Sequence, residues 1–150
     1  MVSLLKTALM VNSPIRSRWS GWGLVPGPVD FVEPFDSTDM HDPTAEYEMG
    51  SVAEVALSLP GVELTHAATP SWWDWRAHWM GEGGSYITLE MTLFDVDLPC
   101  FGGFGVDADC TPSELLDLWL ALKREFPQLW LHSPECRLYK PGSFSTEFAV

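Results

Sequence analysis

Residues 86–94 read Tyr-Ile-Thr-Leu-Glu-Met-Thr-Leu-Phe, and apolar and polar side chains alternate from Ile87 to Leu93. Successive side chains of a β-strand point to opposite faces, so this period predicts a strand over Tyr86–Phe94. Its apolar face consists of Ile87, Leu89, Met91 and Leu93. Because a sheet must cover such a face, we expect helices to pack on that side.

The most complete helix signal begins at Thr111. Thr111 suits the N-cap, Pro112 suits the first helical position, and Glu114 stands where its carboxylate can return a hydrogen bond to the cap. The helix is expected to end near Phe126, because Pro127 follows. Its buried face is predicted to contain Leu115, Leu118, Trp119 and Leu122.

Two segments repeat the order helix, proline, strand. In the first, apolar residues at helical spacing over 51–59 precede Pro60, and an alternating strand over 62–66 follows. In the second, the helix from Thr111 precedes Pro127 and a strand over Leu129–His132. This shared order is explained either by internal duplication or, more simply, by convergence on a common pattern.

Two further extended segments complete the predicted sheet. The first covers Phe101–Val106, where repeated glycines indicate a bulge or a close backbone approach, and the second covers Arg137–Tyr139. The sequence therefore predicts one α+β domain over residues 1–150. We expect a two-layer sandwich with a central, mostly antiparallel sheet and two helix–strand units. Residues 13–50 contain so many prolines and glycines that only short extended pieces, such as Val29–Phe35, are expected there.

The charge of the chain is strongly negative. Lys and Arg number 8 against 21 Asp and Glu, which gives a net charge of -13, and no Lys or Arg stands between Arg18 and Arg76. Nucleic acids and anionic membrane surfaces are disfavoured as partners, because binding to phosphates needs basic side chains. A basic protein surface or a cation is favoured instead.

The cysteines and the start of the chain bear on the compartment. Cys100, Cys110 and Cys136 are odd in number, and Lys6 interrupts the apolar residues of a segment that lacks the features of a secretory signal. Reduced thiols in the cytoplasm are therefore expected. No apolar run reaches the roughly 20 residues that a membrane span needs.

No catalytic or metal-binding motif is convincing in the sequence. Asp36, Asp39, His41 and Asp42 lack the spacing of a calcium loop. Cys100, Cys110, His132 and Cys136 are too scattered for a structural zinc site, and the glycines over 102–105 lack the lysine of a phosphate-binding loop. We therefore expect no metal, no cofactor and no enzymatic activity. An arrangement of Cys110 with His132 or His78 and Asp107 stays open as a cysteine nucleophile and its base.

Tryptophans concentrate between residues 72 and 79. Neither a helix nor a strand over this segment turns all of them to one side, so either an exposed patch or a loop that caps the core is possible. The predicted partner-binding residues combine this segment with the acidic one: Asp30, Glu33, Asp36, Asp39, Asp42, Glu46, Glu48, Trp72, Trp73, Asp74, Trp75 and Trp79.

The leading functional hypothesis is a bacterial immunity or antitoxin protein. Small size, acidity and abundant aromatic residues suit an inhibitor that occludes a basic surface on a toxin acting in the cytosol. One alternative is a small hydrolase or transferase that assembles its site from scattered His, Cys and Asp residues. The other is a phage-derived inhibitor whose carboxylates mimic a nucleic acid.

Overall fold

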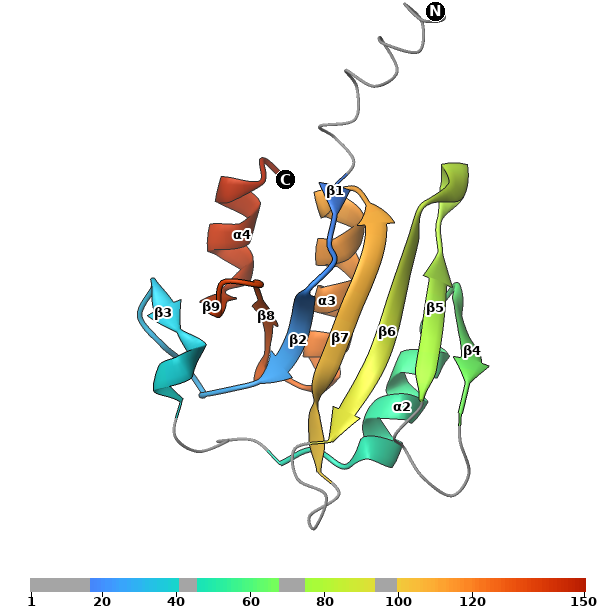
Figure 1. The fold of residues 1–150 in the computed structure, drawn as a ribbon, viewed down its shortest axis with the longest axis horizontal. Helices are drawn as coiled ribbons and strands as arrows, with labels where there is room; N and C mark the ends of the chain where they lie inside the picture. Colours follow the sequence, from blue (N-terminus) through green and yellow to red (C-terminus); the bar gives the residue numbers. More distant parts are fainter. Residues whose placement is uncertain (1–16, 41–45, 68–74, 94–99) are drawn as a thin grey trace, which may run out of the picture.

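A central antiparallel sheet organises the computed structural model, which describes residues 17–40, 46–67, 75–93 and 100–150. The sheet has nine strands in the order β3-β9-β8-β2-β7-β6-β5-β4, and β1 also pairs with β7 (Figure 1). The strands are β1 (Ser17–Arg18), β2 (Trp22–Pro26), β3 (Phe35–Asp36), β4 (Val62–His66), β5 (Arg76–Met80), β6 (Tyr86–Leu93), β7 (Phe101–Cys110), β8 (Leu129–His132) and β9 (Arg137–Tyr139). The helices are α2 (Met49–Ser58), α3 (Pro112–Glu125) and α4 (Pro141–Glu147), with 3-10 turns η3 (Ser37–Asp39) and η4 (Glu82–Gly84). The predicted α+β fold is confirmed.

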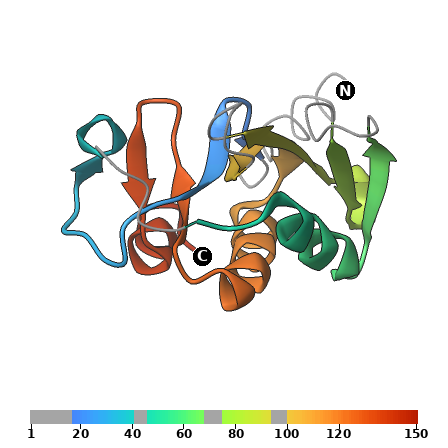
Figure 2. The same cartoon turned by 90° about the horizontal axis from the view of Figure 1, so that it is seen from below.

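The three α-helices of the described residues lie on one side of the sheet, as the view from below shows (Figure 2). Ile87, Leu89 and Met91 of β6 are buried beneath this layer, whereas Thr88 is half-buried and Glu90 and Thr92 are exposed on the opposite face. The alternation in the sequence therefore separates the two faces of the strand as predicted. Phe94, the last residue of the predicted strand, lies outside the described residues.

The start of α3 has the predicted capping box. The Glu114 N–H donates to Thr111 Oγ1 at 3.2 Å, and the Thr111 N–H donates to Glu114 Oε1 at 2.9 Å. Ser85 Oγ, on the turn before β6, donates to Glu114 Oε2 at 2.7 Å and so connects the sheet with the helix. The residues predicted to be buried, Leu115, Leu118, Trp119 and Leu122, all lie in the core.

The glycines of β7 produce the predicted irregularity. Thr92 pairs with Gly103 and Leu93 pairs with Phe101, so Gly102 is an extra residue in the ladder. Gly103 has a φ of 129°, and a Cβ on it would lie 2.9 Å from the carbonyl oxygen of Leu24 on β2. β2 and β7 therefore approach each other more closely than a side chain here would allow. The strand continues past its predicted end at Val106 as far as Cys110.

Strand β2 is a short extended piece within residues 13–50, as expected there, but its position was not predicted. Its five residues, Trp22–Pro26, lie between β7 and β8 near the middle of the sheet. Pairing on both edges and full burial of Leu24 stabilise a strand whose glycine and proline weaken its local signal. Val29–Phe35 is not a strand, because β3 begins only at Phe35.

Helix α4 was not predicted and depends on aromatic packing. Phe144 is fully buried, and its ring lies 5.8 Å from Trp19, 6.2 Å from Tyr139 and 4.7 Å from Phe148 between ring centroids. A seven-residue helix is too short to be stable alone, so these contacts hold it in place. Among the described residues, no helix is long and apolar enough to cross a membrane.

Candidate functional site

The face of the sheet opposite the described helices, here called the open face, carries carboxylates from several strands. Glu63 of β4, Glu90 of β6 and Asp107 of β7 are all exposed. The ladder places Glu63, His78, Thr88 and Asp107 in one row across these strands, and Arg76, Glu90 and Gly105 in the adjacent row. Side chains opposite each other in such rows share a face, so the three carboxylates lie on the same face of the sheet.

Few basic groups balance these carboxylates. Arg76 is the only Lys or Arg in strands β4, β5, β6 and β7. It lies directly across from Glu90, yet the ion pairs of the described residues are Arg137–Glu147 and Lys140–Asp30, both away from this face. Even with Arg18 of β1, which is paired with Asp109 in the ladder, the described part of the open face has a net negative charge, and none of its carboxylates forms an ion pair within the described ranges.

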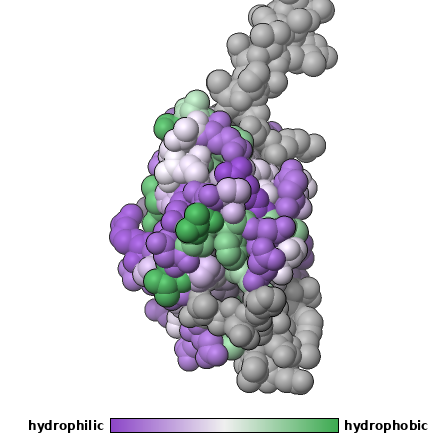
Figure 3. Space-filling model, turned by 90° about the vertical axis from the view of Figure 1, so that its left-hand side faces the viewer, coloured by the Kyte–Doolittle hydropathy of each residue, from purple (hydrophilic) through white to green (hydrophobic). Residues whose placement is uncertain are grey.

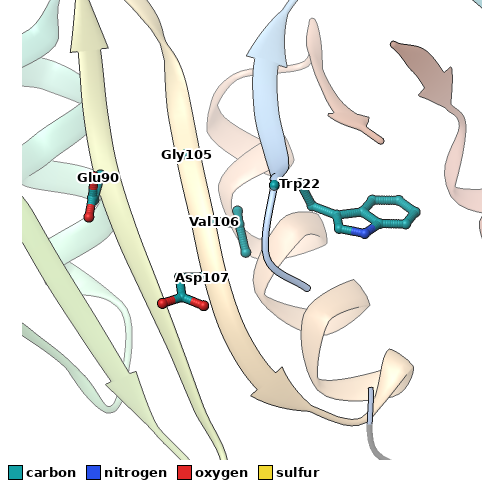
Figure 4. A pocket seen from close by; sticks show the side chains of 6 residues that line it. Trp22, Glu90, Gly105, Val106 and Asp107 are labelled. Carbon is teal, nitrogen blue, oxygen red and sulfur yellow. The ribbon is translucent and has the colours of Figure 1, made fainter. Parts of the chain in front are cut away.

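A hollow of about 310 Å³ lies next to two of these carboxylates. Its lining consists of Gly21, Trp22, Glu90, Gly105, Val106 and Asp107. Figure 4 shows Glu90 and Asp107 on the adjacent strands β6 and β7. Gly105 adds no side chain between them, which leaves room for a group brought by a partner.

His78 is held by its neighbours on the open face. Its Nδ1 lies 3.0 Å from Thr88 Oγ1, and its ring is stacked on Tyr86 with 5.6 Å between ring centroids. The ring is therefore positioned by both the hydrogen bond and the stacking contact. These contacts orient His78 within the surface and give the centre of the open face a defined shape.

The acidic segment predicted to bind a partner has internal contacts instead over much of its described length. Asp30 forms an ion pair with Lys140 at 2.6 Å, and the hydrogen bond from this lysine, together with its charge, lowers the pKa of the Asp30 carboxyl. Glu33 Oε1 accepts from Ser143 Oγ at 2.7 Å. These two carboxylates of the predicted binding segment are therefore paired with residues near the C-terminal end of the chain.

Asp36 also serves a local role. Its Oδ1 accepts from the Thr38 N–H at 2.9 Å and from Thr38 Oγ1 at 2.7 Å, which caps η3 and lowers the pKa of the Asp36 carboxyl. Asp39, Glu46 and Glu48 are exposed, and Ser51 Oγ donates to Glu48 Oε2 at 3.4 Å. The predicted site residues Asp42, Trp72, Trp73 and Asp74 lie outside the described residues.

The two described tryptophans of the predicted patch differ in position. Trp75 is only 2% exposed, and its ring packs near Phe104 with 5.8 Å between centroids, so it belongs to the core and not to a binding surface. Trp79 is half-buried and covers Gly61, where a Cβ would lie 3.2 Å from the Trp79 ring. The apolar environment under the sheet explains both positions.

The sheet order separates the acidic segment from Trp79. Asp36 is on β3 at one edge, whereas Trp79 is on β5, next to the opposite edge (Figure 1). Asp36 and Trp79 therefore do not belong to one surface. Seen from the β3 side, the molecule is mostly hydrophilic with scattered apolar patches (Figure 3).

One polar contact that the sequence did not predict joins η3 to β8. Ser37 Oγ and His132 Nε2 are 2.8 Å apart, although the residues are 95 positions apart in the chain. Burial lowers the pKa of His132, while the charge of Asp36 acts to raise it. A serine nucleophile would need the far side of the imidazole to be oriented by a third group. Among the described contacts none is made by His132 Nδ1, so we interpret this bond as a structural connection.

Of the arrangements that the sequence leaves open, that of Cys110 with His132 is not assembled. Cys110 is completely buried at the end of β7, whereas His132 is in line with Gly23 and Gly105, well before that end. Within the described ranges, no three His, Cys, Asp or Glu side chains are grouped so that they could hold a metal ion. The open face is therefore the site that the geometry favours.

Comparison of the chain with protein-family models, with curated proteins and with solved structures found no match.

Proposed function

We propose that this protein is an inhibitor of the immunity or antitoxin class, which uses the open face to occlude a basic surface on a bacterial toxin that acts in the cytosol. The observation that carries the proposal is the set of exposed carboxylates Glu63, Glu90 and Asp107, which share one face without an ion pair among the described residues. A carboxylate exposed to water loses little free energy when it exchanges solvent for a Lys or Arg side chain of a partner.

The support is both electrostatic and structural. A net charge of -13 attracts a basic partner from a distance and speeds its association. The carboxylates stand on strands that are paired on both sides, except β4 at the edge. Their positions are therefore largely set before binding, which reduces the entropy lost when a complex forms.

Two triple variants with equal net charge test this proposal. The first, Glu63→Gln with Glu90→Gln and Asp107→Asn, neutralises the open face. The control, Glu54→Gln with Asp117→Asn and Glu125→Gln, removes the same charge from exposed positions on α2 and α3. The partner is recovered by co-purification with the tagged protein from its source cells, and association rates are measured across a salt series.

We expect the open-face variant to slow association by about tenfold at low salt and to flatten its salt dependence. The control variant should keep most of the wild-type rate, since its charges point away from the partner. Equal slowing in both variants would mean that net charge alone determines the association rate. In that case, or if neither variant changes the rate, the open face is not the binding surface.

A further inference from the structure

Strand β4 is an edge strand of the sheet. It is the last strand in the order, and among the described residues no strand pairs with its outer side. Glu63, Leu64, Thr65 and His66 are all exposed, with Leu64 at 48%. The opposite edge, β3, is only two residues long. β4 is therefore the longer template for adding a strand.

The hydrogen-bond pattern shows which backbone groups of β4 face outward. The Met80 N–H donates to the Gly61 carbonyl at 3.3 Å. Because bonded pairs alternate in an antiparallel ladder, Glu63 forms the next bonded pair with His78. The N–H and C=O of Leu64 consequently point away from β5, toward the side where a new strand would lie.

The first three residues of the edge carry few of the common protective devices. Its sequence, Val-Glu-Leu-Thr-His, contains neither Lys nor Pro, which natural proteins use to block strand addition. The register shift in the pairing with β5 comes only after Leu64. Residues 62–64 therefore keep a regular extended backbone.

We propose that β4 accepts an extended, basic strand of the partner protein, antiparallel to it and paired with Leu64. This inference rests on the proposed function and names the contact through which the partner binds. Leu64 shares the helix side of the sheet with Ala77, its cross-strand neighbour, whereas Glu63 lies on the open face with His78. Successive side chains of an added strand alternate between the same two faces. Its apolar residues therefore lie beside Leu64, and its Lys or Arg residues lie beside Glu63.

Charge favours a basic partner over a second copy of this chain. Glu63 is the only acidic or basic residue of β4 apart from His66, and a second copy would bring another net charge of -13 to the same edge. A lysine or arginine of the added strand instead meets Glu63, and other basic residues of the partner meet Glu90 and Asp107 further along the open face. The partner therefore contacts β4 and the open face together.

A short peptide that alternates lysine and valine, with blocked ends, tests the inference on the full-length protein. In the proposed pairing the valine N–H groups point at β4 and the lysine N–H groups point away. We expect the peptide to shift the amide NMR signals of β4 and to slow hydrogen exchange at Leu64 by about tenfold. Methylating the backbone nitrogens of the valines should abolish these effects. Methylating the backbone nitrogens of the lysines should leave them unchanged.

Two substitutions at one position test the protein side. Leu64→Pro removes the N–H that points outward, and it breaks no hydrogen bond to β5. A proline is compatible with the solvent side of an edge strand, so the strand itself should persist. It should weaken peptide binding by about tenfold or more. Leu64→Thr keeps the N–H and should bind within about threefold of wild type. If Leu64→Pro does not fold, the two methylated peptides on the unchanged protein still decide the question.

Three outcomes would overturn the inference. The first is equal binding of both methylated peptides, which would mean attraction by charge without strand pairing. The second is a set of shifts at Glu90 and Asp107 without any at β4. The third is a dimer of the protein alone that Leu64→Pro converts to a monomer, because β4 would then pair with a second copy. None of these results tests the proposed function. That proposal is contradicted only by the triple-variant experiment with the whole partner.

Discussion

Gly103 is a single residue on which the packing of two central strands depends. Its φ of 129° is unfavourable for any other residue, and a Cβ would lie 2.9 Å from the Leu24 carbonyl. We expect Gly103→Ala to lower the free energy of unfolding by about 1–3 kcal/mol. Gly105→Ala is the matched control on the same strand, since its Cβ would have its nearest contact at 3.9 Å. Urea denaturation of both variants measures the difference, and equal losses would contradict this explanation.

His132 is the residue whose protonation should affect stability near neutral pH. Burial lowers its pKa in the folded protein, so the unfolded chain binds the proton at a higher pH. The neutral His132 ring contributes fully to the free energy of unfolding above the unfolded-state pKa of about 6.5. This contribution decreases as the pH falls through and below that value. Unfolding measured between about pH 7 and 5 should therefore show a steeper loss for wild type than for His132→Asn. Parallel curves would contradict the prediction.

At the scale of elements, α4 illustrates a helix that exists because of its contacts. Phe144 is fully buried, whereas Phe148 at the end of the helix is half-buried. Phe144→Ala is expected to cost about 3–5 kcal/mol of stability, and Phe148→Ala clearly less. Chemical denaturation, with far-UV circular dichroism to follow helix content, measures both variants. A loss in Phe144→Ala no larger than that in Phe148→Ala would mean that α4 does not depend on this packing.

The whole molecule carries more negative charge than its internal contacts balance. At a net charge of -13 the folded state repels itself, and added salt screens this repulsion. We expect the melting temperature to rise between low salt and about 0.5 M sodium chloride. The rise should be smaller for the open-face triple variant, because three carboxylates on one face of the sheet are absent. A melting temperature that is independent of salt would indicate that the carboxylates are too far apart to interact.

The elements with strong local signals could be predicted from the sequence. Alternation along residues 86–93 and the capping box at Thr111 act over a few residues, so strand β6 and helix α3 follow from the order of side chains alone. Strands β4, β8 and β9 and helix α2 were predicted for the same reason. The excess of negative charge and the absence of Lys and Arg from residues 19–75 are also properties of the sequence itself.

Only the tertiary structure decided which of those charges and aromatic rings reach the surface. Asp30 meets Lys140 and Glu33 meets Ser143 across more than half of the chain, which a local pattern cannot reveal. Trp75 and Trp79 are close in sequence, yet pairing of β5 with β6 buries one and leaves the other half-covered. Strand β2 is likewise stabilised by neighbours on both sides rather than by its own residues. The open face arises in the same way, because its carboxylates come from strands that only the folding of the sheet brings together.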